Sequence, residues 1–275
     1  MKPILSLATL ILLSSGLEAQ DRIEDNSFLI EEAYNQGRGI VQHISAFQRA
    51  EGGDWEYSFT QEWPFLSQHN QLSFTLPLAN LSNGPGDGKT GLGDIGLNYR
   101  RQLMGVGGGR VALSPRFTLL LPTGDEETGH GSGGVGFQTN LPISVLLSNR
   151  LVTHYNAGFT ITPSARNTVG DKASSFGYHL GASAIVLVTS RLNLMLEGIW
   201  SSSQQVVGGD LTDVVEEAFL NPGFRYAFDT RGGLQIVPGI AYTIGIGPSE
   251  GENGLFVYLS LEHAFSRAGR AEGSN

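Results

Sequence analysis

The strongest constraint in this sequence is an alternation of apolar and polar residues that repeats along the chain in segments of about ten residues. In one such segment Leu72, Phe74 and Leu76 alternate with Ser73 and Thr75. Successive side chains of a β-strand point to opposite faces, so this period of two predicts strands with one apolar and one polar face. The first of the twelve segments is the weakest, and together they cover 40–49, 55–65, 71–78, 94–100, 110–121, 137–147, 154–161, 176–184, 192–200, 220–228, 234–244 and 255–265.

The length of these segments separates a membrane barrel from a soluble β-sandwich. Strands of soluble proteins usually have about five or six residues. A tilted strand needs roughly 9–11 residues to cross the hydrocarbon layer of a membrane. Most of the alternating segments are near that length, and after residue 20 no run approaches 18 consecutive apolar residues. Transmembrane helices are therefore excluded, and membrane-crossing strands are favoured.

The connections between the segments carry independent information, because short and long ones alternate. The short connections are 67–69, 105–109, 148–150, 189–191 and 229–233. The longer, polar ones are 80–92, 123–134, 163–174, 201–217 and 245–253, and only the first connection on that side, 51–54, is short. Short periplasmic turns and long extracellular loops are typical of outer-membrane barrels. We therefore predict an all-β fold, a transmembrane up-and-down antiparallel β-barrel of about 12 strands over residues 40–265, in the outer membrane of a diderm bacterium.

Aromatic residues are placed where such a barrel would meet the two headgroup layers. With the N-terminus in the periplasm, one set falls near the outer ends of the strands: Trp55, Phe176, Tyr178, Trp200 and Tyr242. A second set falls near the inner ends: Trp63, Phe65, Tyr99, Tyr226 and Phe228.

The first residues have the order of a secretory signal peptide. Lys2 precedes an apolar run over 4–13, and small residues follow up to Ala19. This run is too short to span a bilayer as a stable helix, so we expect residues 1–19 to be a cleaved export signal. Residues 20–39 would then form a periplasmic N-terminal segment. Its stretch 30–36 resists the strand pattern and could be a short helix, an extended plug in the barrel mouth or a plain periplasmic arm. Residues 266–275 form a C-terminal tail.

Composition removes several function classes. The formal net charge is −9 and only 16% of residues are charged, without a cluster of Lys or Arg, so nothing would neutralise the phosphates of a nucleic acid. Cysteine is absent, which excludes disulfides and thiolate metal sites. The histidines His43, His69, His154, His179 and His263 are scattered and lack the spacing of metal ligands, so we predict no metal site and no cofactor.

In a barrel the polar face of each strand is the lumen. Charged residues there are costly against lipid but are tolerated in water or in a paired network. An open aqueous pore and a plugged, salt-bridged interior would both satisfy them. The expected lumen-facing residues are Glu56, Glu62, Asp94, Arg100, Arg110, Arg116, Glu197, Arg225 and Glu262.

Four short motifs resemble one family of exported barrels. They are FLIEEAYNQ over 28–36, GIVQHI over 39–44, GLGDIGL over 91–97 and LPTGD over 121–125. The family is an outer-membrane β-barrel "transporter" family named for the meta pathway of phenol degradation. The resemblance covers most of the chain after the signal peptide, and it implies passage or binding of small, aromatic compounds.

The last two motifs are explained by turn chemistry at the outer ends of neighbouring strands. Glycine permits tight turns and close backbone approach, and Asp side chains accept hydrogen bonds from nearby N–H groups. We therefore expect structural roles for Gly91, Gly93, Asp94, Pro122, Thr123, Gly124 and Asp125.

The leading functional hypothesis is a monomeric outer-membrane channel or transporter for small solutes, aromatic or hydrophobic compounds among them. We expect it to be folded by the barrel assembly machinery and surrounded by outer-membrane lipid and lipopolysaccharide. One alternative is a barrel hydrolase with His130 as the base for Ser132, but no third group to orient the histidine is evident, so we predict no enzyme. The other alternative is a non-enzymatic binding protein that meets a partner through its outer loops.

Overall fold

Long alternating segments of the sequence form β-strands in the computed structural model of the protein, which describes residues 23, 27–82 and 88–265. The expected signal peptide and C-terminal tail lie outside these residues. The strand segments are β1 (Ile40–Ala50), β2 (Trp55–Phe65), β3 (Ser67–Leu81), β4 (Lys89–Leu92), β5 (Ile95–Arg101), β6 (Val111–Leu113), β7 (Arg116–Leu121), β8 (Gly136–Asn140), β9 (Ile143–Ser148), β10 (Leu151–Arg166), β11 (Lys172–Leu187), β12 (Leu192–Gly208), β13 (Leu211–Tyr226), β14 (Phe228–Asp229), β15 (Gln235–Gly245) and β16 (Gly254–Ala264).

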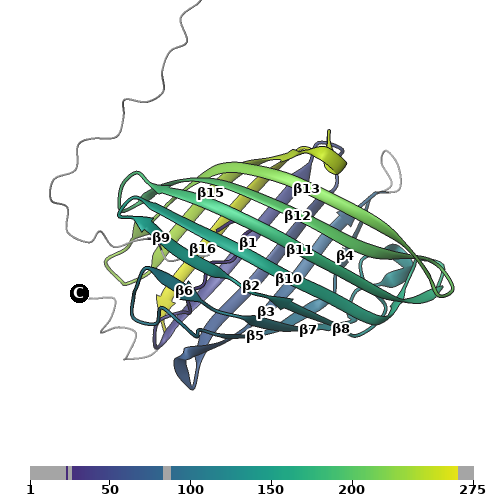
Figure 1. The fold of residues 1–275 in the computed structure, drawn as a ribbon, viewed down its shortest axis with the longest axis horizontal. Coiled ribbons are helices and arrows are strands. Elements are labelled where there is room, and N and C mark those ends of the chain that lie inside the picture. The colour runs from purple at the N-terminus through teal and green to yellow at the C-terminus, as the bar shows by residue number, and fades with distance from the viewer. Residues whose placement is uncertain (1–22, 24–26, 83–87, 266–275) are drawn as a thin grey trace, which may run out of the picture.

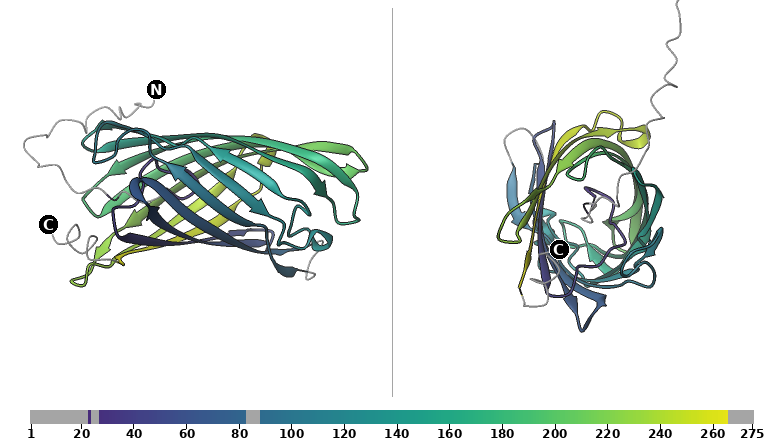
Figure 2. Two further views of the ribbon diagram at one scale, coloured as in Figure 1. Left: turned by 90° about the horizontal axis from the view of Figure 1, so that it is seen from below. Right: turned by 90° about the vertical axis from the view of Figure 1, so that its left-hand side faces the viewer.

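These sixteen segments make twelve strands, because four strands are each divided in two. β4 and β5 both pair with β3, and β13 and β14 both pair with β15. β8 and β9 both pair with β10, while β7 pairs with β8 and β6 with β9. All pairings are antiparallel, and the pairs β1–β16 and β10–β11 close the ring (Figures 1 and 2). The predicted twelve-stranded up-and-down barrel is confirmed.

The alternation in the sequence separates the outer surface of the barrel from its interior. On β16, Leu255, Val257 and Leu259 are 43%, 38% and 37% exposed, whereas Phe256 and Tyr258 between them are 3% and 2% exposed. The outer surface is therefore apolar, and lipid tails solvate such a surface more favourably than water does. The strands span a membrane with this face outward.

Helical structure in the described residues consists of two 3-10 turns, η1 (Glu126–Thr128) and η2 (Gly247–Ser249). Across the described ranges, no helix combines the length and the apolar character needed to cross a membrane. The turn before β6 needs left-handed backbone, and glycine supplies it: Gly105, Gly107, Gly108 and Gly109 have φ of 81°, 77°, 110° and 134°.

Two of the predicted long loops are instead paired strands. The stretches 163–174 and 201–217 belong largely to the hairpins β10–β11 and β12–β13, whose ends project beyond the rest of the barrel (Figure 1). The ladder between β12 and β13 runs without a loop from Leu192 opposite Tyr226 to Gly208 opposite Leu211. The prediction of long loops is wrong for these two connections because apolar alternation marks only the part of a strand that faces lipid. Beyond the membrane both faces of a strand can be polar.

Aromatic rings gather on the outer surface toward both ends of the strands. Tyr178 contacts Phe176 and Trp200, with ring centroids 6.3 and 5.3 Å apart. Toward the opposite ends of the strands, Tyr226 and Phe228 have ring centroids 4.7 Å apart. These rings are amphipathic or apolar groups at the levels where headgroups meet hydrocarbon.

Candidate functional site

The segment before the first strand lies inside the barrel. Figure 2 (right) looks along the barrel and shows this purple stretch within the ring of strands. We call residues 27–36 the luminal segment. Its hydrogen bonds to the wall run in order from β12 to β10 and β9, then to the residue after β5, to β3 and finally to β1. The segment therefore passes most of the way round the lumen.

Glu197 of β12 holds the beginning of the luminal segment. Its Oε1 accepts hydrogen bonds from the backbone N–H groups of Phe28 at 2.9 Å and Ile30 at 3.3 Å. The N–H of Leu29 reaches both carboxylate oxygens, at 3.2 and 3.1 Å, and Asn221 of β13 donates to Oε2 at 3.0 Å. Glu197 is fully buried. Several N–H groups that converge on one carboxylate form a charge-assisted anchor, which we call the Glu197 anchor.

A buried ion pair fixes the middle of the luminal segment. Nη2 of Arg225 on β13 lies 2.9 Å from Oε1 of Glu32, and their side chains are 1% and 4% exposed. The same guanidinium donates to the carbonyl oxygen of Ile23 at 3.3 Å, and Nε2 of His154 lies 3.7 Å from the same oxygen of Glu32. A buried charge is costly unless it is paired, so each partner here requires the other.

Arg100 of β5 binds the backbone of the luminal segment from the opposite wall. Its Nη2 donates to the carbonyl oxygen of Tyr34 at 2.7 Å, and its Nε donates to Oδ1 of Asn35 at 3.1 Å. Glu62 of β2 lies 3.6 Å away and balances its charge. The planar guanidinium of Arg100 thereby connects the luminal segment to β5, which carries it, and to Glu62 of β2.

Glu31 makes the most exposed of these contacts. Its Oε1 lies 2.7 Å from Nη2 of Arg116 on β7, and the two side chains are 23% and 18% exposed. Its backbone is bound by Asn156 of β10, whose Oδ1 accepts from the N–H of Glu31 at 2.8 Å and whose Nδ2 donates to its carbonyl oxygen at 2.9 Å. The amide of Asn156 thus takes the place that a neighbouring strand would have.

Three more backbone N–H groups of the segment donate to side-chain oxygens of the wall in the same manner. The pairs are Ala33 with Ser144 Oγ at 2.8 Å, Asn35 with Gln102 Oε1 at 3.0 Å, and Gln36 with Gln71 Oε1 at 2.9 Å. The wall therefore satisfies the backbone of an extended chain with side chains instead of a strand ladder.

The ring of Phe28 fills an apolar socket in the wall. Its centroid lies 5.4 Å from that of Phe256 and 5.5 Å from that of Tyr258, both on β16. Glycines leave room for the ring, because a Cβ at Gly239 would lie 2.6 Å from its Cζ and a Cβ at Gly223 would lie 2.8 Å from its Cε2. Phe28 is 8% exposed in this socket.

At the mouth that we expect to face outward, called the outer mouth, Asp94 holds the connection between β7 and β8. Its Oδ1 accepts from the N–H of Gly124 at 3.0 Å, and its Oδ2 accepts from the N–H and the Oγ of Ser132 at 2.8 and 2.6 Å. Thr123 donates its Oγ1 to the carbonyl oxygen of Gly93 at 3.0 Å. The two sequence motifs therefore meet through their turn residues.

Close approach explains the glycines of these motifs. A Cβ at Gly91 would lie 2.6 Å from the ring of His130, and a Cβ at Gly124 would lie 2.7 Å from Cα of Gly131. Asp125 caps η1 by accepting the N–H two residues later at 3.0 Å, and Pro122 is exposed at the end of β7. Asp94, Thr123, Gly124 and Asp125 therefore make turn and hydrogen-bond contacts in this connection.

The predicted lumen-facing residues fall into three groups. Glu62, Arg100, Arg116, Glu197 and Arg225 surround the luminal segment, and Asp94 lies at the outer mouth. The last group comprises Glu56, exposed near the start of β2, Arg110, exposed in the turn before β6, and Glu262, partly buried on β16. The sequence did not identify the uncharged contacts Gln71, Gln102, Ser144 and Asn156. Gln71, Ser144 and Asn156 do lie on the polar face of their alternating segments, which is the only signal that could have found them.

His130 and Ser132 do not form a catalytic pair. The Oγ of Ser132 is bound to Asp94 and to the carbonyl oxygen of Gly134. The ring of His130 is bound through Nδ1 to Thr128 at 2.9 Å and through Nε2 to two backbone carbonyl oxygens. In the described residues, no group of three or more His, Cys, Asp or Glu side chains is arranged to hold a metal ion.

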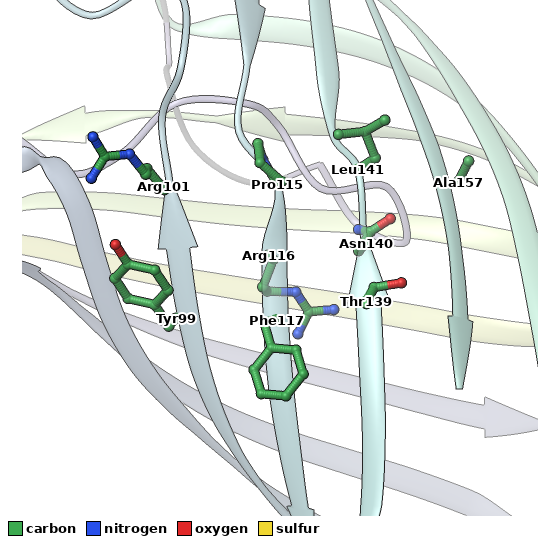
Figure 3. A pocket seen from close by; sticks show the side chains of 9 residues that line it. All are labelled: Tyr99, Arg101, Pro115, Arg116, Phe117, Thr139, Asn140, Leu141 and Ala157. Atoms are coloured by element: carbon green, nitrogen blue, oxygen red, sulfur yellow. The ribbon is translucent and has the colours of Figure 1, made fainter. Parts of the chain in front are cut away.

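A groove of about 430 Å³ lies on the wall where two strands are interrupted (Figure 3). Pro115 divides β6 from β7, and Pro142 divides β8 from β9; neither has an N–H for the ladder. The outward side chains Tyr99, Phe117 and Leu141 line the groove and are 38%, 46% and 40% exposed. The groove therefore belongs to the lipid-facing surface.

Comparison with solved structures places the fold among outer-membrane barrels. The chain is similar to the COG4313 outer membrane channel from Pseudomonas putida F1, with a TM-score of 0.62 and 14% identity over 85% of this chain and 98% of that one. A more distant likeness is the KdgM porin, with a TM-score of 0.48 and 7% identity over 82% of this chain and 99% of that one. No family model matches the sequence, and no curated protein matches it.

Proposed function

We propose that the protein is an outer-membrane channel for small solutes and that the luminal segment is the plug that closes it. The observation that carries the proposal is that this segment is bound to the wall on opposite sides, by the Glu197 anchor and by Arg100. The COG4313 channel, which has the same fold, supports it. We expect a monomer that is folded by the barrel assembly machinery and lies in outer-membrane lipid and lipopolysaccharide.

The contacts of the luminal segment suit a plug that can leave. Apart from the Phe28 ring, they are hydrogen bonds and ion pairs with side chains of the wall, and water can take over these polar contacts when the segment moves. The barrel itself is held by continuous ladders, such as the eleven pairs between β1 and β16. Release of the segment therefore leaves the wall intact.

Conductance across planar bilayers tests the plug. Deletion of residues 27–36 should raise single-channel conductance several-fold over that of the parent protein, because the lumen loses the chain that crosses it. Because the protein has no cysteine, two introduced cysteines can be oxidised to each other alone, which provides a matched control. The double variant Ala33→Cys/Ser144→Cys places two cysteines where the N–H of Ala33 meets Ser144 at 2.8 Å.

Oxidation of that pair should hold the channel closed, and reduction should restore the behaviour of the parent. The single variants should not respond to the oxidant. If the deletion conducts no better than the parent protein, the segment is not the plug. If neither form carries any ion or solute, the channel itself is ruled out.

We further propose that the transported solutes include small aromatic compounds. The support is the Phe28 socket, which holds a single aromatic ring between Phe256 and Tyr258. When the luminal segment leaves, this socket is open to a ring supplied by a solute. The resemblance to the phenol-pathway barrels points to the same class of compound.

Flux into proteoliposomes tests this finer statement. Phenol should enter faster than a sugar of similar size, and Phe28→Ala should change the ratio of the two rates because the socket is then vacant. Equal rates for both solutes in the parent and the variant would rule out an aromatic preference while leaving the channel proposal standing.

A further inference from the structure

Two histidines from opposite ends of the chain meet on the outer surface of the barrel. His43 lies on β1 and His263 on β16, the first and last strands of the ring. Their Nε2 atoms are 3.3 Å apart, and their rings are stacked with centroids 5.4 Å apart. Both side chains are partly exposed. The pair bridges the seam at which the barrel closes.

The distance between the two nitrogen atoms matches a shared metal ion. Zinc binds histidine nitrogen at about 2.0–2.1 Å in tetrahedral geometry, which places two ligand nitrogens about 3.3 to 3.4 Å apart. The two Nε2 atoms are hydrogen-bonded to each other at 3.3 Å, and this distance equals that spacing. The two ring nitrogens can therefore coordinate one ion without rearrangement of the strands.

The second ring nitrogen of His263 supports this assignment. Nδ1 lies 3.3 Å from the carbonyl oxygen of Ala264. A carbonyl oxygen only accepts, so Nδ1 carries the hydrogen and Nε2 of the neutral ring presents its lone pair toward His43. Histidines that bind metals are usually oriented in this manner by a carbonyl group or a carboxylate.

The surroundings keep the pair accessible to an ion from water. His263 pairs with Val41, one step from the last rung of the ladder, so the pair lies near the end of the strands that we expect to face the periplasm. The ring of Phe59 on β2 stacks on His43 with centroids 6.1 Å apart and fixes its orientation. Water would have to fill the remaining coordination positions.

From this arrangement we propose that His43 and His263 bind one divalent transition-metal ion, of the class of zinc, and that the ion clamps the first strand to the last. The chemical class follows from two neutral imidazoles, which suit zinc, copper and nickel but not magnesium or calcium. Neither histidine is among the contacts of the luminal segment described above, so the proposal does not rest on the plug.

Zinc titration of the refolded, tag-free mature protein in detergent tests the site. The parent protein should bind one zinc ion per chain. His43→Gln and His263→Gln should each weaken binding at least tenfold. His69→Gln, which changes an exposed histidine at the start of β3, is the matched control and should bind as the parent does.

Thermal unfolding supplies a second readout. Zinc should raise the unfolding temperature of the parent protein and of His69→Gln, because a ligand that binds only the folded state stabilises it. It should not raise that of the two seam variants, whose circular dichroism without metal should match the parent. Absence of stoichiometric zinc binding by the parent, or equal binding by His43→Gln, would overturn the proposal.

Discussion

The two ends of the luminal segment are held by different physical means. Residues 28–30 are bound through their backbone, by N–H groups that converge on Glu197, and through one apolar ring in its socket. Residues 31–36 also have backbone hydrogen bonds to neutral wall side chains, but they alone carry the ion pairs, Arg225 on Glu32 and Arg116 on Glu31. The first end would accept many sequences at its backbone contacts. The second end depends on two specific carboxylates.

This difference indicates which contacts of the luminal segment resist its release. The N–H groups of residues 28–30 share one acceptor, so loss of Glu197 leaves all of them without it at once. The first end should therefore be released as a unit. The second end has two separate ion pairs, and salt screens the more exposed of them, Glu31 with Arg116. The first end should therefore act as the hinge that holds the segment in place, and the second should set how readily it moves.

The largest effect is expected for Glu197→Ala. It removes the acceptor for the N–H groups of Phe28, Leu29 and Ile30 and leaves them buried without that partner. Each unsatisfied buried group costs about 1–3 kcal/mol, so release of the segment should become easier by about 4 kcal/mol or more. Hydrogen exchange of residues 27–36 by mass spectrometry should accelerate strongly, and the open probability in bilayers should rise.

Glu197→Gln is the informative companion, because its amide oxygen can still accept hydrogen bonds but carries no charge. It should show an intermediate effect. Exchange in Glu197→Ala that remains as slow as in the parent protein would show that the backbone contacts do not hold the segment.

The second effect in size is expected for Arg225→Met. This variant strands the buried carboxylate of Glu32, whose side chain is 4% exposed. Removal of one partner of a buried ion pair typically costs about 3–5 kcal/mol. Hydrogen exchange at residues 31–33 should accelerate more than exchange at residues 28–30, which keep their anchor.

The double variant Glu32→Gln/Arg225→Met removes both charges and should recover much of the loss. Thermal unfolding of the single and double variants gives the coupling between the two residues. Additive losses would show that Glu32 and Arg225 do not act as a pair, contrary to the 2.9 Å contact.

The barrel could be predicted from the sequence because its signals are local and repeated. The alternation along β16 and the lengths of the connections can be read within short stretches of sequence. The same pattern recurs in each of the twelve strands. The hairpin ends of β10–β13 were missed because outside lipid a strand no longer needs an apolar face. The local pattern therefore locates the membrane-spanning part of a strand and not its end.

The candidate site could be predicted only in part, because its contacts join residues far apart in the chain. Glu197 and Arg225 have the inward parity of their strands, so they were identified as luminal, but their partners 28–32 lie more than 160 residues away. His43 and His263 lack ligand spacing in the sequence, and only the closure of the ring brings their nitrogen atoms to 3.3 Å. Spacing along the sequence can reveal a site formed within one strand or helix. It cannot reveal a site formed where the first and last strands meet.

A third prediction tests the apolar half of the first end. Gly239→Ala should displace the Phe28 ring, because the added Cβ would lie 2.6 Å from its Cζ. Overpacking of this kind costs about 1–3 kcal/mol. Thermal unfolding should show this loss in the parent background. In a Phe28→Ala background the same substitution should cost little, since the ring is gone, and an equal loss in both backgrounds would contradict the assignment of the socket.

The smallest effect is expected for Arg116→Ala at the charged end. Its pair with Glu31 is 2.7 Å long but 18% and 23% exposed, and partly exposed ion pairs contribute about 1 kcal/mol or less. The other hydrogen bonds of Arg116, to Asn98, Thr118 and Gln138, join strands of the wall and do not hold the segment. Open probability should rise slightly at low salt, and the difference from the parent should shrink as potassium chloride is raised, because salt screens exposed charges.

The salt dependence distinguishes the two ends of the luminal segment more sharply than the size of either effect. The Glu197 side chain is fully buried, so the consequence of Glu197→Ala should change little between low and high salt. If Arg116→Ala is insensitive to salt while Glu197→Ala is sensitive, the roles of the two ends are exchanged. The hinge of the plug would then lie at Glu31, and the Phe28 end would be the part that moves first.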